Sequence, residues 1–138
     1  MVNLNLFILQ RNSSICFLHN MKNRWFELPC GNIEELLGKE IKNINLIGKI
    51  TVEEYSIKNH YQLFHLSVEE KQKILINPKY YDYCKFIPIA KILQHKISPH
   101  TSVLFHEFEV VQLQNRIYFM RRSTPRERYS RCFLEGLI

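Results

Sequence analysis

Hydrophobic residues in the first part of the chain come in short runs separated by polar turns, a pattern typical of β-strands. Leu4–Leu9 and Ile15–His19 flank the polar segment 10–14, QRNSS, which predicts a β-hairpin. Trp25–Leu28 predicts a third short strand, and Pro29 ends it. The start of the chain is therefore expected to be a hairpin with one further strand.

The middle of the chain continues this extended pattern. Asn45–Ile57 is rich in β-branched residues, and Tyr61–Leu66 alternates enough to lie beside it as a neighbouring strand. Lys85–Ile89 predicts another strand, and Ile89–Leu93 predicts a brief helix directly after it. Ile117–Met120 is apolar and predicts a last extended segment.

Three short segments carry the signals of helix starts. Ser67–Glu70 places a hydroxyl three residues before a carboxylate, which is a capping box. Ser98–Pro99 places proline at a first helical position, and Thr124–Glu127 combines a hydroxyl cap, a first-turn proline and a capping glutamate. The predicted helices are Val68–Leu75, Pro99–Val111 and a C-terminal helix from Thr124 to about Leu137. Together with the strands they predict a mixed α+β domain.

Length and composition narrow the class of protein. A chain of 138 residues that is 46% hydrophobic is long enough for one core and too short for two ordinary domains. It contains no apolar run of membrane-spanning length, and its first residues lack a basic start and a small-residue cleavage site. We therefore expect no membrane partner. The four cysteines form no C-x-x-C pair and are interpreted as reduced core thiols, which predicts a cytoplasmic or organellar-matrix location.

Charge points to a polyanionic partner. The net charge is +6 with a pI near 9.2, which favours nucleic acid, nucleotides or an acidic protein face. Most of the arginines lie in the last 23 residues, a segment that contains no lysine. These arginines are Arg116, Arg121, Arg122, Arg126, Arg128 and Arg131.

The stretch 24–41, RWFELPCGNIEELLGKEI, contains the most specific motif in the chain. An aromatic residue, a proline turn, a glycine and a glutamate follow the predicted hairpin. In this order the segment resembles the first strands of the Nudix hydrolase family and the start of its Nudix box. The corresponding residues are Trp25, Leu28, Pro29, Cys30, Gly31 and Glu34. Later segments, GKITVEEY, HYQLFHLSV and YCKFIPIAKIL, are similar to later family strands, so the resemblance covers about Leu4–Phe108.

The resemblance implies a single Nudix-like α/β/α sandwich with a mixed sheet. We expect a Nudix-like domain over residues 1–114, and residues 115–138 are expected to form an arginine-rich extension with a basic helical tail. The family's catalytic helix carries an Arg-Glu-x-x-Glu-Glu segment that binds magnesium or manganese beside a diphosphate. If Gly38 closes the box that Gly31 opens, this segment is missing and the helix is shortened.

The shortened box predicts a domain without a resident metal. Only Glu34 and Glu35 survive between the two glycines, and a helix of that length has about a turn and a half. Hard divalent cations need several oxygen ligands, so we expect no cofactor and no Nudix hydrolase activity. If the chain is active, the resemblance makes Glu34 and Glu35 the ligands of magnesium or manganese. The acidic pairs at 53–54, 69–70 and 107–109 remain alternative sources of ligands.

The arginine-rich end is the second candidate site. Arginine makes planar, multidentate contacts to phosphate, and tyrosines between the arginines can stack on unpaired bases. The predicted phosphate- or RNA-binding set consists of Arg116, Arg121, Arg122, Arg126, Arg128, Arg131, Tyr118 and Tyr129. Two alternatives stay open for this segment: docking onto a protein, or a solvated tail that only aids solubility.

Three functions follow from these observations. The preferred one is a non-catalytic Nudix-fold binding or structural module that contacts RNA or a larger ribonucleoprotein or multi-subunit assembly. The alternative is a divergent metal-dependent hydrolase of nucleoside diphosphate derivatives. The third is an accessory or effector protein that docks a partner chain.

Overall fold

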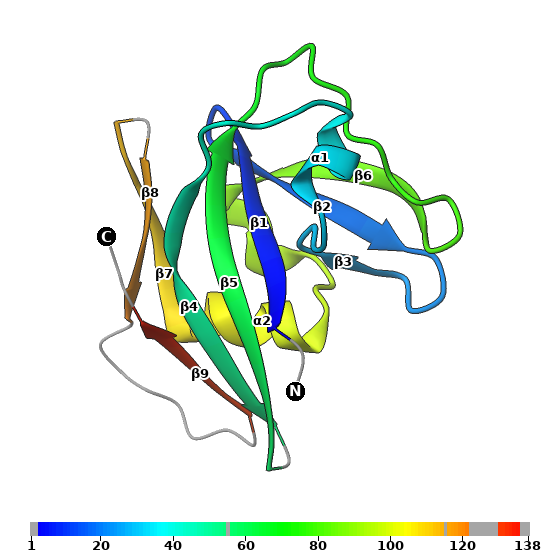
Figure 1. The fold of residues 1–138 in the computed structure, drawn as a ribbon. Coiled ribbons are helices and arrows are strands. Elements are labelled where there is room, and N and C mark those ends of the chain that lie inside the picture. Colours follow the sequence, from blue (N-terminus) through cyan, green and yellow to red (C-terminus); the bar gives the residue numbers. More distant parts are fainter. Residues whose placement is uncertain (1–2, 55, 115, 122–129, 136–138) are drawn as a thin grey trace.

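The computed structural model describes residues 3–54, 56–114, 116–121 and 130–135. This part of the chain contains nine strands and three short helices (Figure 1). The strands are β1 (Asn3–Arg11), β2 (Ser14–Asn20), β3 (Trp25–Glu27), β4 (Asn45–Glu54), β5 (Ile57–Ser67), β6 (Tyr81–Pro88), β7 (Phe108–Leu113), β8 (Arg116–Arg121) and β9 (Ser130–Glu135). The helices are α1 (Ile33–Leu37), the 3₁₀ helix η1 (Ile89–Gln94) and α2 (Pro99–Glu107).

Seven strands form one mixed sheet. Their order is β3-β2-β1-β5-β4-β9, and β6 pairs with β2 as well. β1 and β5 run parallel, whereas the other pairs in this sheet are antiparallel. β7 and β8 form a separate antiparallel hairpin. The α+β class with a mixed sheet is thus confirmed.

The predicted hairpin at the start of the chain is present, and it splits soon after its turn. β1 and β2 pair only next to the turn, where Gln10 lies opposite Ile15. Asn12 takes a positive φ of 55° in that turn, a conformation that asparagine tolerates better than most residues. Farther along, β1 pairs with β5 while β2 pairs with β3 and β6.

The two faces of the large sheet bury separate hydrophobic clusters. Because side chains alternate along a strand, Ile8 joins one cluster while Phe7 and Leu9 join the other. The first cluster packs under η1, α2 and the β7–β8 hairpin. The second packs under α1, through Leu36 and Leu37. The five-residue α1 is therefore held to the sheet by two leucines.

The predicted helix Val68–Leu75 is wrong. This segment runs without helical structure across α1, where Leu75 N donates to Leu36 O at 2.7 Å and Gln72 Nε2 donates to Leu37 O at 3.0 Å. Ser67 is the last residue of β5, paired with β1, and is not the cap of a helix. Contacts to α1 thus outweigh the local capping signal.

The helix predicted from Pro99 begins where expected and ends early. α2 stops at Glu107, and residues 108–113 form β7. Phe108 is buried in the first cluster and Val110 packs against it, which suits the two-residue period of a strand. Pairing with β8 therefore decides the conformation of this segment.

The predicted C-terminal helix is wrong over Ser130–Glu135. These residues form β9, which pairs antiparallel with β4 from Lys49↔Glu135 to Glu54↔Ser130. The capping signal at 124–127 lies outside the described residues. The expected boundary after residue 114 falls between β7 and β8, which pair with each other.

No helix in the described ranges is both long and apolar enough to cross a membrane.

Candidate functional site

The segment that resembles the start of a Nudix box is a tight loop followed by a five-residue helix. Gly31 has a φ of +100°, a conformation that favours glycine. The side chain of Asn32 caps α1, since its Oδ1 accepts from Glu34 N at 2.8 Å and from Glu35 N at 3.3 Å. Gly38, with a φ of +68°, ends the helix and donates its N–H to Glu34 O. Local caps thus fix both ends of α1.

The two glutamates of α1 do not form a metal site with the described residues. Glu34 and Glu35 are both exposed. Magnesium takes near-octahedral oxygen coordination, usually with carboxylates as anchors. In the ranges that the structure describes, no three His, Cys, Asp or Glu side chains are placed to hold a metal ion, and this includes the acidic residues at 53, 69–70, 107 and 109. The family's metal therefore does not fit the described part of this chain.

Another carboxylate near the loop is already committed to other partners. Glu27 Oε1 accepts from Trp25 Nε1 and from Asn20 Nδ2, and Glu27 Oε2 accepts from Tyr81 Oη at 2.9 Å. Burial, followed by the charge of Glu27, raises the pKa of Tyr81, so its hydroxyl stays protonated as a donor. Glu27 thus joins β3 to β6.

A mostly apolar cleft opens beside the loop, and we call it the α2 cleft. Its volume is about 250 Å³, and it lies between the N-terminus of α2 and residues of β1, β3, β4 and β5. Trp25, Tyr61 and Cys30 are among its lining residues. Burial and then the nearby Glu27 raise the pKa of the Cys30 thiol. The cleft therefore has two aromatic side chains, Trp25 and Tyr61, among its lining residues.

Comparison with known proteins gives structural matches only. No family model and no curated protein matches the sequence. The structure matches a MutT Nudix hydrolase from Burkholderia pseudomallei with a TM-score of 0.59 and 12% identity, over 73% of this chain and 92% of that chain. It also matches the MutT mutator protein from Bacillus halodurans with a TM-score of 0.57 and 14% identity, over 77% of this chain and 80% of that one.

A third match is the Nudix domain of NrtR from Shewanella oneidensis, solved in complex with ADP ribose. Its TM-score is 0.56 with 11% identity, over 74% of this chain and 82% of that chain. The fold is Nudix-like. Identities this low show the fold alone, and the resemblance seen in the sequence is confirmed at that level.

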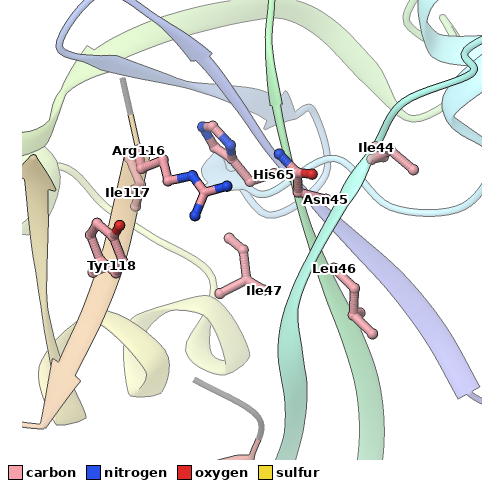
Figure 2. A pocket seen from close by; sticks show the side chains of 8 residues that line it. All are labelled: Ile44, Asn45, Leu46, Ile47, His65, Arg116, Ile117 and Tyr118. Carbon is pink, nitrogen blue, oxygen red and sulfur yellow. The ribbon is translucent and has the colours of Figure 1, made fainter. Parts of the chain in front are cut away.

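In this Nudix-like fold, two of the predicted phosphate-binding residues line a second cavity, the Arg116 pocket. Its volume is about 170 Å³, and it lies between β8 and the neighbouring ends of β4 and β5. Figure 2 shows the Arg116 guanidinium pointing from β8 toward His65 on β5, with Asn45 nearby on β4. Tyr118 lies beside Arg116 on the same strand. Among the described residues that line the pocket, none is acidic.

His65 forms the buried end of this pocket. It is 6% exposed, and its Nε2 lies 2.7 Å from Gln10 Oε1. Burial and then the charge of Arg116 lower the pKa of His65, so the imidazole is neutral near pH 7. Because Gln10 Nε2 donates to Asn12 O, Gln10 Oε1 is an acceptor and Nε2 of His65 carries the proton. Among its described lining residues, the pocket therefore has one cation, Arg116, beside neutral polar groups.

The other predicted phosphate-binding residues are spread apart or lie outside the described ranges. Arg121 is at the opposite end of β8 from Arg116, with its guanidinium over the Phe108 ring and 3.9 Å from the Glu107 carboxylate. Arg131 is on β9, in register with Glu53 of β4. Arg122, Arg126, Arg128 and Tyr129 lie outside the described residues. Of the predicted residues that the structure describes, it thus brings together Arg116 and Tyr118.

Sequence reasoning missed His65 and Asn45 as pocket residues. A usable signal existed for His65, because it follows Leu63 at a two-residue spacing and so occupies an inward-facing position of β5. No local signal singled out Asn45, whose role depends on how β8 approaches the sheet.

Cys16, Cys30 and Cys84 are free thiols. Cys16 is buried, as expected of a core thiol, whereas Cys84 is half-buried and Cys30 is exposed, so the expected core position is wrong for Cys30. Cys16 on β2 and Cys84 on β6 are hydrogen-bonded to each other. This bond lowers the pKa of Cys84 to about 6, whereas the bond and burial raise that of Cys16. The pair joins two strands of the large sheet.

Proposed function

We propose that this chain is a non-catalytic Nudix-fold module that binds RNA as a component of a ribonucleoprotein or other multi-subunit assembly. The observation that carries the non-catalytic part is the length of α1. Five residues present two exposed glutamates, and no three-ligand group exists among the described residues. Metal-assisted cleavage of a phosphoanhydride needs a firmly held cation to neutralise charge and activate water, and α1 offers too few ligands for one.

The Arg116 pocket supports a phosphate-bearing ligand. A guanidinium binds phosphate oxygens through two parallel hydrogen bonds, and the pocket places it beside neutral polar groups without an acidic competitor among the described lining residues. Tyr118 adds an aromatic surface at the same place. With a net charge of +6, the whole chain attracts a polyanion. RNA supplies phosphates and unpaired bases together.

Hydrolase assays test the non-catalytic part. A broad panel of nucleoside diphosphate derivatives is incubated with the protein and either magnesium or manganese, for the wild type, Glu34→Gln and Glu35→Gln. We expect no turnover above the protein-free rate in any of the three. Metal-dependent release of a nucleoside monophosphate that disappears in Glu34→Gln would establish the divergent hydrolase instead.

Fluorescence anisotropy with a labelled single-stranded RNA tests the binding part. We expect Arg116→Ala to weaken binding by about tenfold, the scale of one lost charge-assisted contact. Lys39→Ala is the matched control, because Lys39 is an exposed cation that does not line the pocket. Equal affinity of Arg116→Ala and wild type would contradict phosphate binding by Arg116.

A second candidate is binding of a nucleoside diphosphate derivative without cleavage, and the α2 cleft favours it. The cleft places Trp25 and Tyr61 beside the loop at Cys30, and a similar Nudix domain was solved with ADP ribose. Trp25 is the only tryptophan in the chain, so its fluorescence reports occupancy of the cleft directly. Saturable quenching by ADP ribose, without turnover, would support this candidate.

The same preparations separate these proposals from protein docking. We expect RNA to co-purify with the native protein, alone or with protein subunits. A stable protein complex free of RNA would favour the accessory or effector role.

A further inference from the structure

β2, β3 and β6 run together at one end of the large sheet (Figure 1). Four aromatic rings meet there, three from these strands and one from the residue that follows η1. Tyr83 stacks on His19 with centroids 4.7 Å apart and an interplanar angle of 18°. Phe26 packs edge-on against His19 at 5.1 Å and against His95 at 5.6 Å. We call these four residues the ring cluster.

The rings of the ring cluster differ in how exposed they are to solvent. Phe26 is 9% exposed and belongs to the first hydrophobic cluster. Tyr83 is 45% exposed, and neither Tyr83 nor His19 belongs to either hydrophobic cluster. Tyr83 is thus held in place from below by His19 while much of its side chain remains open to solvent. An ordered, half-exposed ring is a suitable surface for another planar group.

Cations lie on the segments next to the ring cluster. Lys85 is two residues from Tyr83 on β6, on the same face, and its Nζ lies 3.4 Å from His95 Nε2. Lys96 Nζ donates to Asn23 O at 3.4 Å, which places it against the turn before β3. That turn also carries two further cations. All four cations are exposed: Lys22, Arg24, Lys85 and Lys96.

The carboxylates that adjoin the ring cluster already have partners in the protein. Asp82 Oδ1 is 2.8 Å from His19 Nδ1. Glu27 accepts hydrogen bonds from Trp25, Asn20 and Tyr81. These partners fix the two carboxylates in place but do not remove their charges. The four cations still outnumber Asp82 and Glu27 by two, so the surface around Tyr83 carries a net positive charge, which suits a polyanion.

We infer that the ring cluster and its four cations form a binding surface for single-stranded RNA. One unpaired base stacks on the exposed face of Tyr83, and the flanking phosphates contact Lys85 and Lys96. This inference rests on the proposed function and locates a contact surface for it outside the Arg116 pocket. Stacking on a tyrosine accepts any base, so the surface binds RNA with little sequence preference.

The test measures the affinity of a labelled single-stranded RNA of about 12 nucleotides, within the range of known site sizes. We expect Tyr83→Leu to weaken binding by about tenfold and Tyr83→Phe to bind as wild type, since phenylalanine keeps the stacking face. Tyr80→Leu is the matched control, because Tyr80 is 52% exposed in the turn before β6 and does not belong to the ring cluster. Circular dichroism verifies that each variant is folded.

The lysines are tested through the salt dependence of binding. Lys85→Ala combined with Lys96→Ala should reduce the slope of log affinity against log salt by roughly 1.4, about 0.7 for each phosphate contact on a single strand. The control combines Lys39→Ala with Lys58→Ala, which removes two exposed lysines elsewhere on the protein. Its slope of log affinity against log salt should be close to that of the wild type.

The outcomes separate this inference from the proposed function. Wild-type affinity in Tyr83→Leu, or equal losses in Tyr83→Leu and Tyr80→Leu, overturns the ring-cluster surface while RNA binding itself stands. Failure of the wild-type protein to bind RNA at all overturns both.

Discussion

At the scale of single residues, His65 shows how a polar group is accommodated in the sheet. It lies on the face that carries the first hydrophobic cluster, and a hydrogen bond to Gln10 satisfies its Nε2. The two partners lie on β5 and β1, the parallel pair of the sheet. The same imidazole forms a wall of the Arg116 pocket, so a residue that links β5 to β1 also borders the proposed phosphate site.

We predict that the protein loses stability in acid through His65. Burial lowers the pKa of His65 in the folded state below its ordinary value of about 6.5, so the unfolded chain binds the proton more readily. The neutral imidazole makes its full contribution to the free energy of unfolding above about pH 6.5, and this contribution is lost as the pH falls below that value. Urea denaturation at a series of pH values measures this trend, and His65→Gln should flatten it. An unchanged slope in His65→Gln would assign the trend to other groups.

The thiol pair gives a second prediction at this scale. Because the hydrogen bond from Cys16 lowers the pKa of Cys84 to about 6, Cys84 should react with iodoacetamide at half its maximal rate near pH 6. Cys30, whose pKa is raised by burial, should need alkaline pH. Peptide mapping by mass spectrometry separates the two sites. Cys16→Ala removes the donor and should move the Cys84 profile to higher pH.

At the scale of elements, α1 is a helix too short to persist alone, and its caps and two buried leucines hold it in place. Asn32→Ala removes the acceptor of two backbone N–H groups and should lower the free energy of unfolding by about 1 kcal/mol. Asn32→Asp keeps a capping oxygen and is the matched control. Denaturant titration measures both, and an equal loss in the two variants would exclude the cap as the cause.

Helices and strands whose conformation is set by residues close by in the sequence could be predicted from the sequence. The first hairpin, the strands of the middle region and the start of α2 each carry alternation or a proline-marked start. The failures share one cause. Val68–Leu75, Phe108–Leu113 and Ser130–Glu135 all carry helix-like signals, and each is fixed by partners far away in the sequence, namely α1, β8 and β4.

In the candidate site, too, some features follow from the local sequence and others depend on residues far away in the chain. Composition singled out Arg116 and Tyr118, and the structure places both at one pocket. Their neighbours His65 and Asn45 come from other strands, so no spacing in the sequence connects them to Arg116. A side chain's type can be read locally, whereas its neighbours depend on the topology of the sheet.

At the scale of the whole molecule, β9 completes the sheet by covering the outer edge of β4. A chain shortened to end at Arg121 loses this strand and leaves a row of unpaired backbone groups on β4. We predict lower stability and concentration-dependent self-association, measured by thermal denaturation and by light scattering coupled to size-exclusion chromatography. Removing only residues 136–138 is the control and should leave the protein monomeric to the same extent as the full chain. A stable, unassociated shortened chain would contradict a structural role for β9.

The pairing of β4 with β9 also bears on how the protein is made. β4 leaves the ribosome well before β9 is synthesised, since β5 to β8 lie between them in the sequence. During that interval the nascent chain exposes one side of β4, the kind of surface that chaperones shield and that recruits other strands. Synthesis that slows between Arg121 and Ser130 would therefore lengthen the time in which misassembly competes with folding.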